Sequence, residues 1–235
     1  MNPVNNEIID FKLRENLQKK LTYILESKNN GLSTKYKDGL IPFQPSLFPL
    51  DAKQLYPGYA SYSLELGSGW GEFALELSQK NPDSLYIALD KKKYRIKKSL
   101  KEQTQKKIPN LRWMVCNLEW IFNGLFEKES FDNIFINFPD PWPKSRHQKH
   151  RFVGPELIDE LTCITKPGGS LEFATDSWSY IQDVLPVFES SVHWKNMHGK
   201  GVILPSLPGR PVSFFENLKR SEKENIYIIQ LEKQL

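Results

Sequence analysis

The hydrophobic pattern of the chain changes at about residue 61. From there on, short apolar runs alternate with segments whose apolar residues recur at helical spacing. The runs predict strands at 62–66, 85–90, 111–116, 131–138, 171–175 and 225–233, and the periodic segments predict helices at about 72–80, 91–107, 155–165 and 177–190. Strands that alternate with helices are typical of α/β proteins. We therefore expect a doubly wound, mostly parallel α/β sheet over residues 61–235.

Residues 1–60 do not continue this alternation. Partial helical spacing of apolar residues predicts a helix at 7–26, which Asn29-Asn30-Gly31 ends. Four prolines within 38–58 exclude a helix there, because proline lacks a backbone N–H and clashes with the preceding turn. The apolar residues between these prolines favour an arm packed on the core. We therefore expect an N-terminal extension, a helix followed by a Pro-rich arm, before one domain at 61–235.

Composition narrows the class of protein. Hydrophobic residues make up 39% and charged residues 26% of the 235 residues, which is ordinary globular usage. No apolar run approaches the roughly 18 residues that a membrane span needs, and charged residues interrupt any signal-peptide core near the N-terminus. Cys116 and Cys163 are far apart and form no CxxC, which argues against a metal cluster or a disulfide framework. We expect a cytoplasmic protein.

A glycine-rich turn, Glu65-Leu66-Gly67-Ser68-Gly69-Trp70-Gly71, follows the first predicted strand and opens a helix. A dinucleotide fingerprint requires its third glycine one position later, where this chain has Glu72. A carboxylate there also disfavours a pyrophosphate at the helix N-terminus. The turn therefore fits a nucleoside cofactor without phosphate better than a dinucleotide.

Polar residues at the ends of the next two predicted strands extend this site. A carboxylate at Asp90 can accept hydrogen bonds from both hydroxyls of a ribose. Asn117 follows the third strand, where an amide can meet an adenine edge. With Glu65 near a cationic methionine end, these residues predict S-adenosylmethionine as the cofactor. The alternatives are a solvated strand-end charge for Glu65 and a helix N-cap for Asp90.

The fourth predicted strand runs into Asn137-Phe138-Pro139-Asp140-Pro141-Trp142-Pro143, in which three prolines fix the backbone around Asp140. Four basic residues and two histidines follow at positions 144–151. His147 and His150 have no third ligand close by, so we expect no metal here.

In residues 138–151 the chain resembles the bacterial tRNA (guanine-N7)-methyltransferases, whose hallmark is a Phe-Pro-Asp-Pro-Trp run followed by a Lys…Arg-His…Lys…Arg cluster. The resemblance extends through Glu65–Gly71, Asp90, the turn at 167–169 and residues 174–176, and covers about 61–216. It implies a Rossmann-like class I methyltransferase domain. The implied reaction moves a methyl group from S-adenosylmethionine to N7 of a guanine in the tRNA variable loop, usually position 46.

The resemblance also implies roles for single residues. The cofactor would be bound by Glu65, Gly67, Gly69, Gly71, Asp90, Asn117 and Asp140, with Asp140 also catalytic. The tRNA substrate would be bound by Lys144, Arg146, Asp176, Ser213 and Glu216. Asn117 and Phe214 depart from the family pattern. They leave two alternatives open: a related methyltransferase for another RNA or a small molecule, and an RNA-binding paralogue with impaired catalysis.

The net charge of +4 hides an uneven distribution. Residues 91–107 hold nine basic residues and one acidic residue, a local charge of +8, and 140–151 add +3, which leaves −7 elsewhere. Such a run is usually a solvated helix face. Because this one begins where the cofactor strand ends, we expect it to contact tRNA together with the 144–151 cluster. Arg210 and Arg220 are weaker candidates, and monomer or homodimer stays open.

Overall fold

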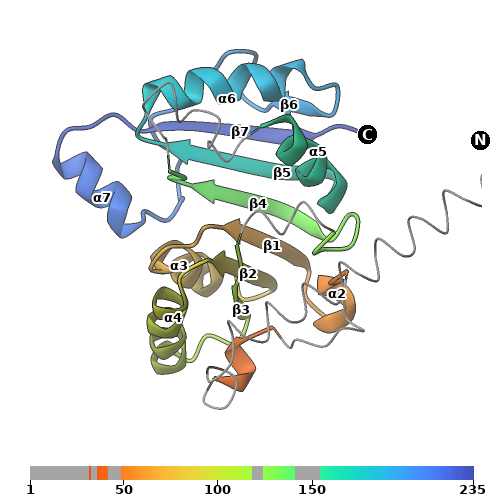
Figure 1. Cartoon of the computed structure of the whole chain (residues 1–235), viewed down its shortest axis with the longest axis vertical. Helices are drawn as coiled ribbons and strands as arrows, with labels where there is room; N and C mark the ends of the chain where they lie inside the picture. Colours follow the sequence, from red (N-terminus) through yellow and green to blue (C-terminus); the bar gives the residue numbers. More distant parts are fainter. Residues whose placement is uncertain (1–31, 33–35, 42–48, 118–123, 141–153) are drawn as a thin grey trace, which may run out of the picture.

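A seven-stranded sheet forms the centre of the molecule, with the strand order β3-β2-β1-β4-β5-β7-β6 (Figure 1). The computed structural model describes residues 32, 36–41, 49–117, 124–140 and 154–235. The strands are β1 (Ser61–Leu66), β2 (Ser84–Asp90), β3 (Leu111–Val115), β4 (Phe131–Asn137), β5 (Thr165–Thr175), β6 (Trp194–Asn196) and β7 (Tyr227–Lys233). The first five pair in parallel, and β7 runs antiparallel to β5 and β6. The doubly wound, mostly parallel sheet predicted from the sequence is confirmed.

Helices cover both faces of this sheet. They are α2 (Ala52–Leu55), α3 (Glu72–Lys80), α4 (Lys93–Lys106), α5 (Pro155–Ile164), α6 (Trp178–Ser190) and α7 (Phe214–Ser221), with a short 3-10 helix η1 (Lys37–Gly39). None of the helices in the described part of the chain is both long and apolar enough to cross a membrane.

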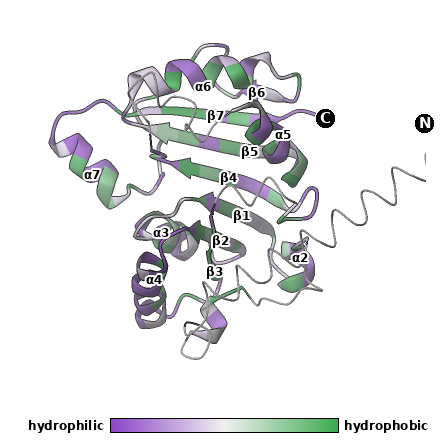
Figure 2. Cartoon of the chain, viewed as in Figure 1, coloured by the Kyte–Doolittle hydropathy of each residue, from purple (hydrophilic) through white to green (hydrophobic). Residues whose placement is uncertain are grey.

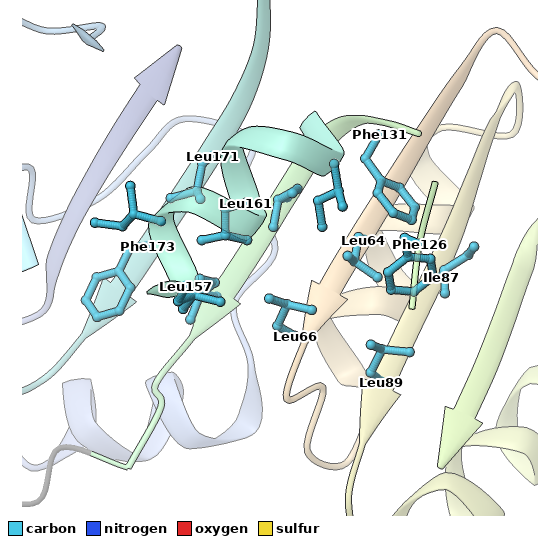
Figure 3. Packing of buried hydrophobic residues seen from close by; sticks show 14 of the residues in the cluster. Leu64, Leu66, Ile87, Leu89, Phe126, Phe131, Leu157, Leu161, Leu171 and Phe173 are labelled. Atoms are coloured by element: carbon cyan, nitrogen blue, oxygen red, sulfur yellow. The ribbon is translucent and has the colours of Figure 1, made fainter. Parts of the chain in front are cut away.

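The core has two layers, one on each face of the sheet. On one face, Leu64 and Leu66 of β1 pack in a cluster with Leu157 and Leu161 of α5 (Figure 3). On the other face, Trp113 of β3 belongs to a second cluster that includes residues from α3 and α4. Helix α4 contributes only one buried stripe to this cluster, and most of its surface is hydrophilic (Figure 2). Its lysines therefore face solvent, whereas Arg95 is partly buried and pairs with Asp90.

Strand order reverses at β1, which pairs with β2 on one side and with β4 on the other. Because the central strands are parallel, their carboxyl ends lie along one edge of the sheet. Ligands of doubly wound sheets bind at this edge, in the crevice where the order reverses. The glycine turn after β1 and the acidic residues that end or follow β2, β4 and β5 all lie at this edge.

The described part of the N-terminal arm packs on the core. Leu40, Ile41 and Leu50 are buried, and the backbone N–H of Ile41 donates to Trp113 O at 3.1 Å. The prediction that prolines exclude any helix within 38–58 is wrong, because α2 forms there. The proline-free stretch between Pro49 and Pro57 is long enough for one turn, which Asp51 caps. The helix predicted at 7–26 lies outside the described residues, and the boundary at residue 60 stays a prediction.

Three further elements differ from the sequence prediction. The turn expected at 167–169 lies within β5, where the pairing register with β4 shifts and Gly168 takes φ +75°. The three-residue strand β6 was not predicted, since so short a run carries no pattern. Helix α7 was not predicted either, although Ser213 caps it by accepting a hydrogen bond from the N–H of Glu216.

Candidate active site

The glycine turn after β1 is hydrogen-bonded to the end of β2. The N–H groups of Gly67 and Ser68 both donate to Leu89 O, at 2.9 and 2.8 Å, and the N–H of Gly69 donates to Asp90 Oδ2 at 3.0 Å. The other carboxylate oxygen of Asp90 accepts from the Lys92 N–H at 2.7 Å. The N-cap alternative for Asp90 is wrong, because the N-cap of α4 is Lys92. Asp90 instead ties together the glycine turn and the start of α4.

Glu65 is a buried carboxyl group, so the alternative of a solvated charge is also wrong. Its Oε1 accepts a hydrogen bond from the side-chain amide of Asn137 at 3.0 Å, across the point where strand order reverses. Burial raises the pKa of Glu65 to about 7, against the opposing effects of Asn137 and Arg210. Nearby Glu72 and Asp90 raise the pKa further.

Two buried polar atoms at this point have no hydrogen-bond partner among the described residues: Glu65 Oε2 and Ser68 Oγ. Buried polar groups are normally paired, so these atoms indicate a place for a polar ligand. A Cβ atom built on Gly69 would meet nothing within 4 Å, which shows open space at the same turn. A buried carboxyl group at the end of the strand that leads into this open turn fits the cationic methionine end of S-adenosylmethionine.

Gly71 has a different reason to be glycine. A Cβ atom there would lie 2.5 Å from Trp113 Cη2 and 2.6 Å from Ser99 Oγ, and the residue has φ +85°. These contacts join the start of α3 to β3 and α4. The glycine at this position is thus required by packing, whether or not its backbone also contacts the cofactor as predicted.

Asp140 lies just beyond β4 at the same edge. The backbone before it is strained, since Phe138 has φ +49°, a left-handed conformation that is uncommon for residues other than glycine. The Asp140 side chain is 72% exposed, and its Oδ2 lies 3.8 Å from Lys91 Nζ at the start of the basic segment. The carboxylate is therefore accessible from solvent, as a group that contacts a large substrate must be.

The structure places the other predicted site residues as follows. Asp176 follows β5, with its Oδ2 3.7 Å from Lys219 Nζ of α7. Asn117 is partly buried two residues after β3. Lys144 and Arg146 lie outside the described residues, as does the rest of 141–153, including His147 and His150. Among the described residues, no group of three or more His, Cys, Asp or Glu could hold a metal ion.

A buried ionic network of Arg210, Glu172 and Glu216 lies next to Glu65. No pattern in the sequence predicts it. Arg210 donates from Nη2 to Asn137 Oδ1 at 2.6 Å and forms ion pairs with Glu172 of β5 and Glu216 of α7. These three charged side chains are each at most 7% exposed. The guanidinium carbon lies 5.0 Å from the centre of the Phe73 ring. The RNA contact considered for Arg210 is therefore wrong, because Arg210 is buried and serves protein acceptors.

Ser213 and Glu216 have structural roles in this arrangement. The Ser213 hydroxyl oxygen caps α7. Both carboxylate oxygens of Glu216 are paired, one with Arg210 and the other with Arg220. The substrate contacts predicted for these two residues stay predictions, and for Glu216 such a contact requires an ion pair to open. The spacing of Glu216 and Arg220, four residues apart on one helix, was the signal that could have indicated the pair.

Comparisons with known proteins show the family of this chain. The sequence profile of a family described as "Putative methyltransferase" matches residues 60–229. A tRNA (guanine-N(7)-)-methyltransferase of Leptospira interrogans is 37% identical over 172 residues, which cover 73% of this chain and 78% of that protein. An enzyme of the same name from Nitrosomonas europaea is 33% identical over 72% of this chain and 74% of that protein. One from Pseudomonas putida is 27% identical over 88% of this chain and 86% of that protein.

Solved structures show the same fold. The crystal structure of the 16S rRNA methyltransferase KamB superposes with a TM-score of 0.59 at 18% identity, covering 78% of this chain and 92% of that one. A SAM-dependent O-methyltransferase from Thermotoga maritima superposes with a TM-score of 0.50 at 15% identity, covering 88% and 71%. At such low identity these likenesses show the fold alone.

Proposed function

Because the chain belongs to the tRNA (guanine-N7)-methyltransferase family, we propose that it transfers a methyl group from S-adenosylmethionine to N7 of a guanine in tRNA. We place the target at position 46 of the variable loop and the protein in the cytoplasm, as a monomer or homodimer. The observation that best supports the proposal is the buried Glu65 carboxyl group at the edge where strand order reverses, whose Oε2 is unpaired within the described ranges.

The residues around the glycine turn would hold the methyl donor. Glu65 would pair with its cationic methionine end, Asp90 would accept hydrogen bonds from its ribose, and Asn117 would meet its adenine. Gly69 lets the ligand approach the backbone. When bound, S-adenosylmethionine supplies an electrophilic methyl group on a sulfonium. The protein has to hold that group in line with the target base.

The target atom needs little chemical help from the protein. Guanine N7 carries a lone pair and no proton, so no general base has to deprotonate it. Holding two reactants in line can supply roughly 7–11 kcal/mol of the barrier reduction. Asp140 would accept hydrogen bonds from guanine N1–H and N2–H and would stabilise the positive charge that develops on the base. Its accessible position on the carboxyl edge supports this role.

Lysines on the exposed face of α4 would bind the tRNA backbone. Lys91 Nζ, just before α4, lies 3.8 Å from Asp140 Oδ2. The basic segment 91–107 therefore starts beside the proposed catalytic carboxylate. Such a surface binds nucleic acid mainly through phosphates, with an affinity that falls as salt rises. Lys144, Arg146 and Asp176 would add contacts to the substrate.

The test is methyl transfer from tritiated S-adenosylmethionine to unmodified bulk tRNA. We expect the wild type to label the tRNA and Asp140→Ala to lose the activity, while calorimetry shows whether the variant still binds the cofactor. Near-wild-type turnover by Asp140→Ala would contradict its catalytic role. Cofactor binding without transfer to any tRNA would favour another RNA or a small molecule as substrate. No cofactor binding by the wild type would favour the impaired RNA-binding paralogue.

A further inference from the structure

Trp70 and Tyr94 form an exposed aromatic pair beside the glycine turn. Their ring centroids are 5.5 Å apart and their planes make an angle of 64°. Trp70 is 37% exposed and Tyr94 is 55% exposed. Aromatic side chains usually bury their large surface, and exposed ones next to a ligand edge are common in binding sites. The proposed methyl transfer itself gives this pair no role.

The backbone beneath the pair is firmly held. The carbonyl oxygen of Trp70 accepts a hydrogen bond from Ser99 Oγ of α4 at 2.9 Å. The next residue, Gly71, packs so closely on Ser99 and Trp113 that no Cβ atom fits there. Trp70 is therefore attached rigidly to α4, the helix that also carries Tyr94.

Two cationic side chains, Lys98 and Arg95, lie close to the rings. Lys98 Nζ lies 4.6 Å from the centre of the Trp70 ring, and Arg95 Cζ lies 5.8 Å from Trp70 and 6.0 Å from Tyr94. The Nε atom of Arg95 is buried and has no hydrogen-bond partner in the described part of the chain. The guanidinium is held in place by Asp90, whose Oδ2 lies 3.4 Å from Arg95 Nη1, so this cation stays beside the rings.

The pair stands at one end of a basic stripe on α4. Ile96, Ser99, Leu100 and Gln103 are the buried residues of this helix. The opposite, exposed face carries Tyr94, Lys97, Lys98 and Lys101, at the spacing that puts residues in one row on a helix. Aromatic rings beside a row of cations are the arrangement that binds single-stranded nucleic acid, because rings stack on bases while lysines bind phosphates.

We propose that Tyr94, held edge to face against Trp70, stacks on an unpaired nucleobase of the RNA substrate while Lys97, Lys98 and Lys101 bind the adjoining phosphates. The inference rests on the proposed function only in taking the substrate to be RNA. The base must be unpaired, because a base inside a duplex already stacks on its neighbours. An acidic protein partner would use the lysines but would gain little from the rings, so the rings favour RNA.

The experiment compares tRNA affinity between Tyr94→Ala, Tyr94→Phe and the wild type, by fluorescence anisotropy with a labelled, unmodified tRNA. We expect Tyr94→Ala to weaken binding about tenfold, the usual effect of removing one base–aromatic stack, and Tyr94→Phe to keep wild-type affinity. Met197→Ala is the matched control, since Met197 is 54% exposed but follows β6, at the other end of the sheet. It should bind tRNA like the wild type.

Salt dependence separates stacking from charge. Tyr94→Ala should leave the slope of log affinity against log salt unchanged, whereas Lys97→Ala combined with Lys101→Ala should reduce it. The proposal is overturned if Tyr94→Ala binds tRNA like the wild type, if Tyr94→Phe loses as much affinity as Tyr94→Ala, or if the wild type does not bind RNA. Tyr94-dependent binding by a wild type that transfers no methyl group would instead refute only the proposed function.

Discussion

Asn137 on β4 donates its side-chain amide to Glu65 on β1, with 3.0 Å between Nδ2 and Oε1, across the point where the strand order of the sheet reverses. The carbonyl oxygen of the same amide, Oδ1, accepts a hydrogen bond from Arg210 Nη2. Asn137 is thereby fixed in one orientation, and it holds one oxygen of Glu65, while the other has no partner in the part of the chain that the structure describes.

The first prediction concerns the pH dependence of cofactor binding. With a pKa of about 7, Glu65 is partly protonated at neutral pH, and pairing with a cation requires the charged form. Affinity for S-adenosylmethionine should therefore weaken as pH falls below about 7, approaching tenfold per pH unit. Calorimetry between pH 6 and pH 8 measures this. Glu65→Gln is the control, because glutamine does not titrate and any pH dependence that remains comes from the cofactor itself. An identical pH profile of affinity in both proteins would refute the prediction.

The same carboxyl group should destabilise the cofactor-free fold at high pH. Its pKa rises from 4.5 to about 7 on folding, so between these values the folded protein keeps a proton that the unfolded chain releases. The free energy of unfolding then falls as pH rises through this window, by on the order of 3 kcal/mol in total. Glu65→Gln should resist urea better than the wild type at pH 8 and lose this advantage near pH 4. A variant less stable than the wild type at pH 8 would contradict the assignment.

A third prediction separates the two arginines that pair with Glu216. Arg210→Met leaves Glu172 without its buried partner and should lower the free energy of unfolding by about 3–5 kcal/mol. Arg220→Met should cost about 1 kcal/mol or less, because the Arg220 side chain is 36% exposed and Glu216 keeps Arg210. Urea unfolding of both variants gives the comparison, and equal losses would show that the buried network is not the stabilising element.

A fourth prediction separates two glycines of the same turn. Gly71→Ala forces a methyl group against Trp113 and Ser99 and should lower the free energy of unfolding by about 2–4 kcal/mol. Gly69→Ala meets no atom within 4 Å, so its cost should stay near 1 kcal/mol, from its φ of +58° alone. Its methyl group would instead occupy the space proposed for the cofactor. Thermal unfolding should therefore show the larger loss of stability in Gly71→Ala, whereas cofactor titration should show the larger loss of affinity in Gly69→Ala.

The fold could be predicted from the sequence where the pattern was long and regular. The strand runs and the periodic segments identified β1 to β4, β7 and α3 to α6 with small errors at their ends, but only residues 171–175 of β5. Helix α2 is not evident from the proline content of 38–58, because a single helical turn needs only the stretch between two of the prolines. Strand β6 was missed because its place depends on pairing with β7, which a local pattern does not contain.

The site could be predicted in its positions but not in its interactions. Parallel strands bring their carboxyl ends to one edge, so polar residues at strand ends were correctly expected to lie together. The burial of Glu65 depends on Asn137, 72 residues away in sequence, and on Arg210, which is farther still. Such long-range pairs leave no local signal. The family resemblance therefore indicated which residues act, and the structure showed how Glu65 and Asn137 are held.

The most direct test of the central claim is the identity of the atom that receives the methyl group. An unmodified tRNA transcript with a guanine at position 46 should be incubated with the protein and S-adenosylmethionine, reduced with borohydride and cleaved with aniline, which breaks the chain at 7-methylguanosine. We predict one cleavage in the variable loop, absent with Asp140→Ala and with a transcript that has adenine at that position. Methyl incorporation without this cleavage, or cleavage elsewhere, would contradict the account.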